Sequence, residues 1–229
     1  MKEKRILYRE IAYVLGLIVL AVGTALMERA DFGMSMVVAP AYLFYVKVSA
    51  FLPFFTFGMA EYVFQALLLI VLIAVMRRVK KSYLFSFATA VLYGFLLDAV
   101  MFVADFIPFE GLVWSVIFYV AGLVICSCGV ALLFHTYIPL EVYEMIVKEF
   151  SEKFKQPIGR VKTVYDCCSC LLGLVLSFLF FGFGVFVGVK WGTVVCAVVN
   201  GWLIGRISGW LDRSFRFEDL LPRGGKSQE

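Results

Sequence analysis

The feature that most constrains the fold is an apolar segment that the chain contains twice. Residues 11–33 read IAYVLGLIVLAVGTALMERADFG, and residues 117–139 read IFYVAGLVICSCGVALLFHTYIP. Aligned without a gap, the two share Ile, Tyr, Val, Gly, Leu, Gly, Ala and Leu at the same places. Each copy is apolar for about five helical turns and then ends in polar residues and a Gly or Pro. The duplication predicts a chain built from two related halves.

The composition indicates whether these two halves fold in water or in a membrane. Hydrophobic residues make up 62% of the chain and charged residues 17%, whereas soluble domains are about 45–50% apolar. The apolar blocks reach the roughly 20 residues that a helix needs to cross a bilayer. The first block is too long for a secretory signal and has no small-residue cleavage site. The net charge of +4 is too small to indicate nucleic-acid binding. We therefore expect an integral membrane protein with short tails.

We expect six membrane spans, at residues 11–27, 59–76, 83–103, 112–134, 163–181 and 193–210. Residues 34–57 are also apolar, but Pro40, Lys47 and Pro53 interrupt them. An interfacial or re-entrant helix is the better interpretation there than a seventh span. Lys and Arg concentrate in the N-terminal, second-to-third, fourth-to-fifth and C-terminal segments. Because such segments stay on the cytoplasmic side, six spans with both termini in the cytoplasm satisfy every connection, and we expect a plasma-membrane location.

The duplication extends beyond the first apolar segment. Residues 140–155 correspond to the interrupted segment 34–57 and have the pattern of an amphipathic surface helix. Their apolar residues at helical spacing are Val142, Met145, Ile146, Phe150 and Phe154. Phe57-Gly58 matches Ile158-Gly159 before the second and fifth spans, and AVLYGFL at 90–96 matches AVVNGWL at 197–203, aligning Gly94 with Gly201.

The predicted fold class is therefore all-α: six transmembrane helices arranged as two three-helix repeats, residues 1–110 and 111–212, with a cytoplasmic tail at 213–229. Each repeat carries its amphipathic or re-entrant helix after the first span. An odd number of spans in each unit inverts the second copy relative to the first. Inverted repeats are common in secondary transporters, which bind their solutes near the midplane where the repeats meet.

Short motifs in both halves resemble those of the YczE/YyaS/YitT-like bacterial membrane proteins. They are Gly23-x-Ala25-Leu26, Gly33-Met34-Ser35, Tyr93-Gly94-x-x-x-x-Asp98, Pro139-x-Glu141, Arg160 with Asp166, and Gly188-x-x-x-Gly192-Thr193. Members often place Pro-Trp and an acidic residue after Gly-x-Ser, whereas Met36, Val37 and Val38 follow here, so only Glu141 retains the acidic group. The resemblance implies a polytopic plasma-membrane protein of largely uncharacterised activity, with transport the usual expectation. It also implies that the soluble C-terminal domain of some relatives is missing.

Ionisable residues within the spans are candidate functional groups, because a charge at membrane depth is costly. Asp98 lies near the outer end of the third span, as a solute or proton site or as a hydrated interfacial carboxylate. Asp166 lies at the cytoplasmic end of the fifth span, four residues after Lys162, which allows an ion pair along one helix face. Alternatively, Asp166 pairs with Arg206 across the bundle and closes an inner gate, although Arg206 can also extend to the interface.

Polar uncharged residues extend this candidate site. Asn200 lies near the middle of the sixth span, where its amide needs a hydrogen-bond partner or a ligand, and Gln65 is similar in the second span. The predicted polar lining consists of Ser35, Asp98, Glu141, Arg160, Asp166, Thr193 and Asn200. The helix breaks near Gly33-Ser35 and Pro139-Glu141 would present backbone groups to a solute.

The cysteines allow a second interpretation of the interior. Cys126 and Cys128 of the fourth span lie at the same depth as Cys167, Cys168 and Cys170 of the fifth. A soft-metal or thiol site is one interpretation, and small apolar packing is the other. The spacing is not that of paired C-x-x-C motifs and there is no histidine cluster, so we expect neither a metal nor a cofactor.

No nucleotide-binding loop, catalytic triad or H-E-x-x-H motif occurs in the chain, so catalysis is not expected. We predict a secondary transporter or permease for a small polar or anionic solute. The alternative is a non-transporting membrane partner, such as the capture subunit of an ATP-driven importer or an accessory factor for an enzyme. The expected partners are the lipid bilayer and a small solute, with a second copy of the chain or another membrane protein left open.

Overall fold

The computed structural model describes residues 4–106, 111–156 and 158–220. Within them the chain forms helices α1 Arg9–Ala30, α2 Ala39–Ser49, α3 Phe57–Met76, α4 Lys81–Ala104, α5 Leu112–Phe134, α6 Val142–Phe154, α7 Ile158–Phe181 and α8 Trp191–Ser214, and strands β1 Arg5–Tyr8 and β2 Phe215–Glu218. All the helices except α2 and α6 are long and apolar enough to cross a bilayer. Each predicted span lies inside one of them. The protein is thus a largely helical, multi-pass membrane protein.

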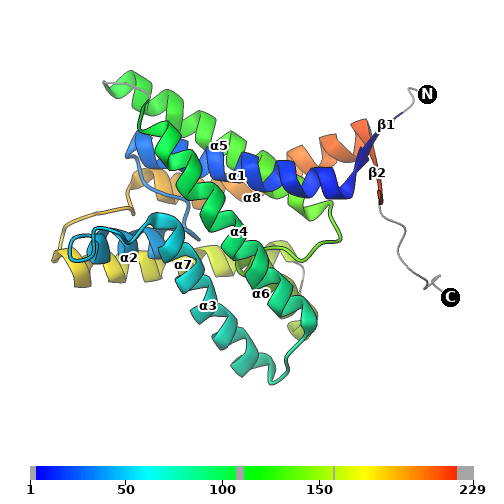
Figure 1. Cartoon of the computed structure of the whole chain (residues 1–229), viewed down its shortest axis with the longest axis horizontal. Helices are drawn as coiled ribbons and strands as arrows, with labels where there is room; N and C mark the ends of the chain where they lie inside the picture. Colours follow the sequence, from blue (N-terminus) through cyan, green and yellow to red (C-terminus); the bar gives the residue numbers. More distant parts are fainter. Residues whose placement is uncertain (1–3, 107–110, 157, 221–229) are drawn as a thin grey trace.

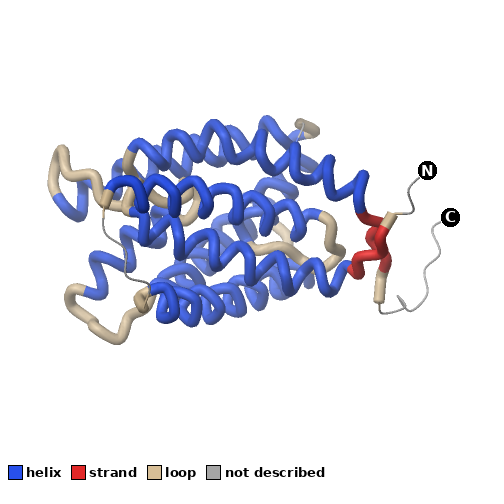
Figure 2. Tube along the Cα trace, turned by 90° about the horizontal axis from the view of Figure 1, so that it is seen from above, coloured by secondary structure: helices blue, strands red, loops and turns tan. Residues whose placement is uncertain are grey.

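The helices follow one another in the order long, short, long, long, and this order occurs twice. The long helices run between the two ends of an elongated molecule (Figures 1 and 2). One end, here the terminal end, contains β1, β2 and the connection at 135–141. The other, here the far end, contains the loops at 31–38 and 182–190. Short helix α2 packs on α3 and α7, and short helix α6 packs on α3, α4 and α7.

Helices α1 and α5 form the central contact of the bundle, and glycines make that contact close. A Cβ added to Gly23 would lie 2.9 Å from the carbonyl oxygen of Gly122, and one on Gly122 would lie 2.8 Å from that of Gly23. The same close approach recurs further along the two helices, where a Cβ on Gly129 would lie 2.9 Å from the Gly16 carbonyl oxygen. Small residues allow membrane helices to pack closely, since lipid provides no hydrophobic drive for their association.

The segment that follows α1 enters the protein core. Met36, Ala39, Ala41 and Leu43 are all fully inaccessible to solvent. The short helix expected within residues 34–57 is α2, which is shorter than that segment, and the chain turns before Pro53. Non-helical backbone is tolerated at membrane depth only where protein or water surrounds it. The buried start of this segment meets that condition.

Helix α6 has the expected apolar stripe but is not a surface helix. Val142, Met145 and Ile146 are buried against Leu72 and Tyr83. Its other faces are covered as well, because Tyr143, Val147 and Glu149 are also buried. Lys148 and the last turn are open, with Phe154 55% exposed. The amphipathic pattern therefore marks a helix that packs beneath α3, α4 and α7.

A two-stranded parallel sheet, absent from the sequence-based prediction, joins the two ends of the described chain. Arg5 to Tyr8 of β1 pair in register with Phe215 to Glu218 of β2, beside the connection that follows α5 (Figure 1). The ring of His135 stacks on Phe217 with centroids 4.5 Å apart, and its Nε2 lies 3.1 Å from Asp212 Oδ1. Residues 213–218, assigned to the predicted tail, thus end α8 and form β2.

Candidate functional site

Two neighbouring spaces that share part of their lining lie within the bundle. A cleft of about 1090 Å³ lies between α7 and α8, with α6 at its side. Deeper in the bundle is a cavity of about 40 Å³. Leu140, Glu144 and Lys162 line both spaces. These side chains therefore stand at the boundary between an open cleft and a small interior cavity.

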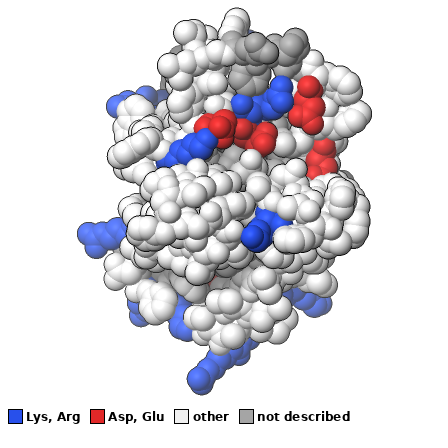
Figure 3. All heavy atoms as spheres, turned by 90° about the vertical axis from the view of Figure 1, so that its left-hand side faces the viewer, with Lys and Arg blue, Asp and Glu red and all other residues white. Residues whose placement is uncertain are grey.

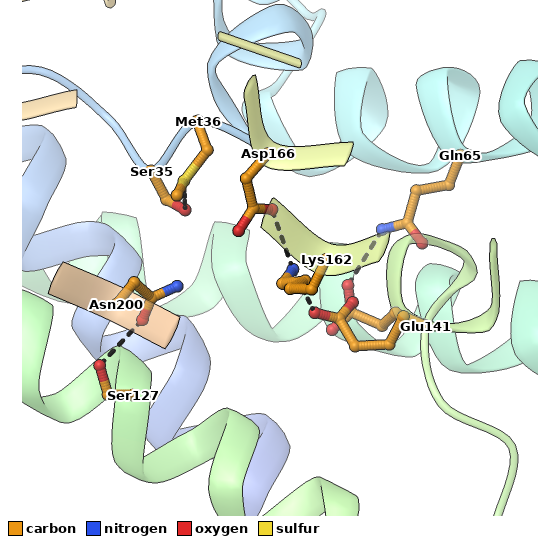
Figure 4. Close-up of polar contacts among 9 residues, drawn as sticks. Ser35, Met36, Gln65, Ser127, Glu141, Lys162, Asp166 and Asn200 are labelled. Atoms are coloured by element: carbon orange, nitrogen blue, oxygen red, sulfur yellow. Dashed lines mark hydrogen bonds and ion pairs between the residues drawn. The ribbon is translucent and has the colours of Figure 1, made fainter. Parts of the chain in front are cut away.

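Lys162 holds the boundary together through two ion pairs (Figure 4). Its Nζ lies 3.1 Å from Oε1 of Glu144 on α6 and 3.2 Å from Oδ1 of Asp166 on α7. The i, i+4 pair expected on α7 is therefore present. Arg206 lies elsewhere, with its guanidinium 5.2 Å from the centre of the Trp202 ring. The acidic partner across the helices is Glu144, which sequence reasoning did not identify.

Next to this boundary, two buried carboxyl groups share one amide. Gln65 Nε2 donates to Oε2 of Glu61 at 3.3 Å and to Oε2 of Glu141 at 3.1 Å. The backbone N–H of Val142 donates to Gln65 Oε1 at 3.1 Å, and the hydroxyl of Tyr143 donates to Glu61 Oε2 at 2.9 Å. Burial raises the pKa of Glu141 well above its ordinary value, and the neighbouring carboxylates Glu144 and Glu61 raise it further.

Sequence reasoning missed Glu61, although a signal was present. Glu61 is an acidic residue inside an apolar span, and it lies four residues before Gln65, which places both on the same helix face. The structure buries both completely. Carboxylates at such a position are functional candidates by the same reasoning that selected Asp98 and Asp166.

The rest of the cavity wall combines hydrogen-bonded polar pairs with aliphatic side chains. Ser127 Oγ donates to Asn200 Oδ1 at 2.9 Å, and Thr24 Oγ1 lies 2.9 Å from the Tyr93 hydroxyl. Apolar residues fill the gaps between them, namely Leu20, Val37, Val38, Val130, Leu133 and Leu140. The wall can hold a small polar group but offers it few charges.

The structure brings four of the predicted site residues together. Ser35, Glu141 and Asn200 line the cavity, and Asp166 lies in the adjoining cleft. Figure 4 shows Ser35, Asn200 and Asp166 arriving from three separate segments around one space. Each of the two predicted helix breaks therefore contributes one residue to the cavity wall: Ser35 comes from the first break and Glu141 from the second.

The other predicted site residues have different surroundings. Asp98 binds the start of α3, accepting from the N–H of Gly58 and from Thr56 Oγ1, both at 2.7 Å. Thr193 is buried at the start of α8, where its hydroxyl donates to the carbonyl oxygen of Gly188 at 3.3 Å. Arg160 is exposed on α7. Asp98 and Thr193 thus fix helix starts, and Arg160 lies outside the lining of both spaces.

At the far end, backbone contacts between two loops cover the bundle. The N–H of Met34 donates to the carbonyl oxygen of Gly188 at 2.8 Å, and that of Gly192 donates to Phe32 at 2.9 Å. Lys190 Nζ lies 2.6 Å from Asp31 Oδ1. Figure 3 shows acidic and basic side chains grouped on this otherwise largely uncharged end.

A family model described as "Family of unknown function (DUF6198)" matches residues 7–209. The chain belongs to this family. The DUF6198 match reaches from β1 almost to the end of α8 and so includes every residue of the cavity wall. The searches of curated proteins and of solved structures found no match. The resemblance to the YczE/YyaS/YitT-like proteins stays a prediction, because the DUF6198 model carries a different name and assigns no activity.

The cysteines of this DUF6198 protein lie in unlike surroundings. Cys126 and Cys196 are buried, whereas Cys167 and Cys168 are exposed, and all are free thiols. Over the described ranges, no three His, Cys, Asp or Glu residues are grouped so that they could hold a metal ion. The expectation that the cysteines bind no metal stays a prediction.

Proposed function

We propose that this DUF6198 protein is a plasma-membrane permease that carries a small polar solute by alternating access between two inverted halves, residues 1–110 and 111–212. The observation that carries the proposal is the composition of the cavity wall. Residues at corresponding places of the two copies meet there, as expected for a solute site on the axis that relates inverted repeats.

The glycine contacts between α1 and α5 support that axis. The offset of 106 residues that takes Gly16 to Gly122 also takes Gly23 to Gly129. In the structure Gly16 faces Gly129, and Gly23 faces Gly122. Exchanging the two copies therefore converts one contact into the other, which is the property of a contact on a two-fold axis.

The cavity wall obeys the same exchange. At the offset of 106 residues, the lining contains five corresponding pairs: Leu20 with Cys126, Thr24 with Val130, Ser35 with Glu141, Val37 with Tyr143, and Val38 with Glu144. The match between AVLYGFL and AVVNGWL adds Tyr93 with Asn200. Equivalent positions of two copies surround one point only when that point lies close to their symmetry axis.

The accessible end indicates the state of the permease. The cleft opens at the terminal end, where the basic segments lie, and we assign this end to the cytoplasm. Lys162, with Glu144 and Asp166, forms the inner gate between cleft and cavity. The cavity of about 40 Å³ accommodates only one or a few water molecules, so solute entry requires the gate to open. Lys162 is the one cation of the wall, beside the carboxyl groups of Glu141 and Glu144, so the wall has no excess of positive charge, which favours a neutral or cationic solute over an anionic one.

The test is uptake into proteoliposomes that contain the purified full chain. A panel of radiolabelled small polar solutes, divided into neutral, cationic and anionic groups, is assayed with and without a proton gradient. We expect saturable uptake of a neutral or cationic solute, and its loss in Lys162→Met. The control is Arg160→Gln, which removes an exposed cation from the same helix and should transport normally. Absence of uptake for every solute would contradict the permease and favour the non-transporting partner.

A further inference from the structure

We propose that Glu61 and Glu141, bridged by Gln65, share one exchangeable proton, so that the solute cavity has a proton-binding site in its wall. The proton site stands on the geometry of these three residues. Its use in coupling solute movement to a proton gradient rests on the proposed function.

The two carboxyl groups are shielded from bulk water, which would otherwise solvate their charges. Glu61 is completely inaccessible and Glu141 is 4% exposed. Oε1 of each side chain is buried and has no hydrogen-bond partner among the described residues. An ionised carboxylate with an unpaired oxygen in such a place is very costly, and neutralisation by a proton removes most of that cost.

The nearby charges do not supply that neutralisation. Lys162 is the cation that acts on Glu141, but its Nζ is already paired with Glu144 and Asp166. The other titratable groups facing the pair are tyrosines from four helices: Tyr13 on α1, Tyr93 on α4, Tyr143 on α6 and Tyr165 on α7. Glu141, Glu144 and Asp166 thus share one ammonium group, and among the described residues no cation acts on Glu61. Two adjacent buried carboxyls without their own cation cannot both ionise.

The orientation of Gln65 favours a proton over a metal cation. The N–H of Val142 donates to Gln65 Oε1, which fixes the amide so that its Nε2 points to both carboxyls. The N–H groups therefore occupy the place between the carboxylates where a cation would need oxygen ligands. In the described residues, no group of three acidic, His or Cys residues is arranged to hold a metal.

Glu141 connects the shared proton to the interior space, because it lines the cavity. When the proton leaves, its O–H bond breaks, the electron pair stays on the carboxylate, and a cavity water accepts the proton. The pair is then doubly charged beside Lys162. Movement of Lys162 towards Glu141 would offset that charge and would break its pairs with Glu144 and Asp166. Deprotonation would thereby favour an open inner gate.

The experiment is infrared spectroscopy of the full chain in lipid vesicles during a pH titration. Neutral carboxyl groups absorb at a frequency separate from that of carboxylates. We expect a neutral-carboxyl band at pH 7 that disappears as the pH is raised, and that is missing in the double variant E61Q/E141Q. The matched control is Glu149→Gln, which removes an α6 carboxylate paired with Lys80 and Arg78 and should leave the band unchanged.

The single variants test whether the proton is shared. In Glu61→Gln or Glu141→Gln, the remaining carboxyl no longer faces a second negative charge, so its band should disappear at a lower pH than in the wild type. Disappearance at the wild-type pH would show independent carboxyls and overturn the sharing. A wild type without the band at pH 7, or a folded double variant that keeps it, would overturn the site. If the double variant does not fold, the wild-type and single-variant titrations still decide.

The proton site and the permease can fail separately. Neutral carboxyls are observed without any solute, so uptake without the band removes the proton site and leaves the permease. A band without uptake removes the permease and leaves a proton-binding membrane protein.

Discussion

The helix pairs α3–α4 and α7–α8 occupy corresponding places in the two halves but are packed differently. A Cβ on Gly94 of α4 would lie 2.9 Å from the carbonyl oxygen of Gly58 on α3, and Asp98 binds the start of α3. In α8, Gly201 stands at the place of Gly94 in the matching segment, and Gly205 at that of Asp98. Both of these glycines face open space in the described structure.

Under the proposed function, the difference suggests α7 and α8 as the pair that moves. The cleft lies along the open face of α8, which includes Gly201, Gly205 and Ser208, whereas the same face of α4 is in backbone contact with α3. Asp98 of α4 latches its pair through the start of α3, whereas the matching position of α8 is Gly205, which has no side chain to do so. In an alternating-access cycle the two pairs would exchange these arrangements, with α7 and α8 closing at their glycines.

The largest expected contrast between the two pairs concerns access of water to α7. Cys167 and Cys168 are neighbours and both exposed, but only Cys167 lines the cleft. In single-cysteine variants, we expect a membrane-impermeant maleimide to label Cys167 from the side that the proposal assigns to the cytoplasm, and to leave Cys168, which lies outside the lining of the cleft, unlabelled. Labelling is measured by mass spectrometry in inside-out vesicles. Equal labelling of the two thiols would show that the cleft is closed in the membrane.

The glycines give the next largest effect. A Cβ at Gly58 would collide with the carbonyl oxygen of Gly94, so Gly58→Ala should lower the free energy of unfolding by about 1–3 kcal/mol. Gly201→Ala meets no atom within 4 Å and should be neutral or stabilising by up to about 1 kcal/mol. Thermal unfolding in detergent measures both. Comparable losses in the two variants would mean that α7 and α8 are packed as closely as α3 and α4.

The carboxylate latch has a smaller but similar effect. Asp98→Ala removes two hydrogen bonds to a charged acceptor and should cost about 2 kcal/mol. The control is Asp105→Ala at the end of the same helix, whose side chain is 68% exposed and lies 3.5 Å from Arg29, and which should cost less than about 1 kcal/mol. The same thermal measurement applies. A variant of Asp98 as stable as that of Asp105 would remove the latch from the comparison.

The smallest effect concerns the anchor that joins α6 to the latched pair. Burial alone would raise the pKa of Glu149, but hydrogen bonds from Lys80 and Arg78 outweigh it and hold the pKa below its ordinary value. The stabilisation is therefore present above the ordinary carboxyl pKa and is lost as the pH falls through the lowered one. We expect Glu149→Gln to lower the melting temperature by about 2 °C near neutral pH and to lose less on acidification than the wild type. An unchanged acid dependence would contradict this assignment.

The sequence predicted the positions of the helices better than the contacts that each element makes in the fold. Span positions follow from apolar length, and the glycines of α1 and α5 were recognisable because they recur at one offset. The burial of α6 was not predictable, because an amphipathic pattern does not distinguish lipid headgroups from protein as the environment of the apolar face. The strands β1 and β2 were missed because they are four residues each and pair across almost the whole chain.

The candidate site shows the same limit. Asn200 was identified from residue type and depth, and Ser35 and Glu141 from the helix breaks and motifs that contain them; the structure brings all three to one cavity. The partners of Asp98 and the neighbours of Glu61 come from distant segments, so no local pattern could reveal that one carboxylate caps a helix and the other shares an amide. Depth in the membrane selects candidates, but only tertiary contacts separate a helix cap from a proton site.

The parallel pairing of β1 with β2 gives the molecule the topology of a ring. Helix α1 begins directly after β1 and α8 ends directly before β2, so the first helix of one half and the last helix of the other are joined without slack. If the halves rock as proposed, the start of α1 and the end of α8 must move together, because the paired strands join them. A chain cut between α4 and α5 and religated through its original termini would preserve every neighbour in that ring.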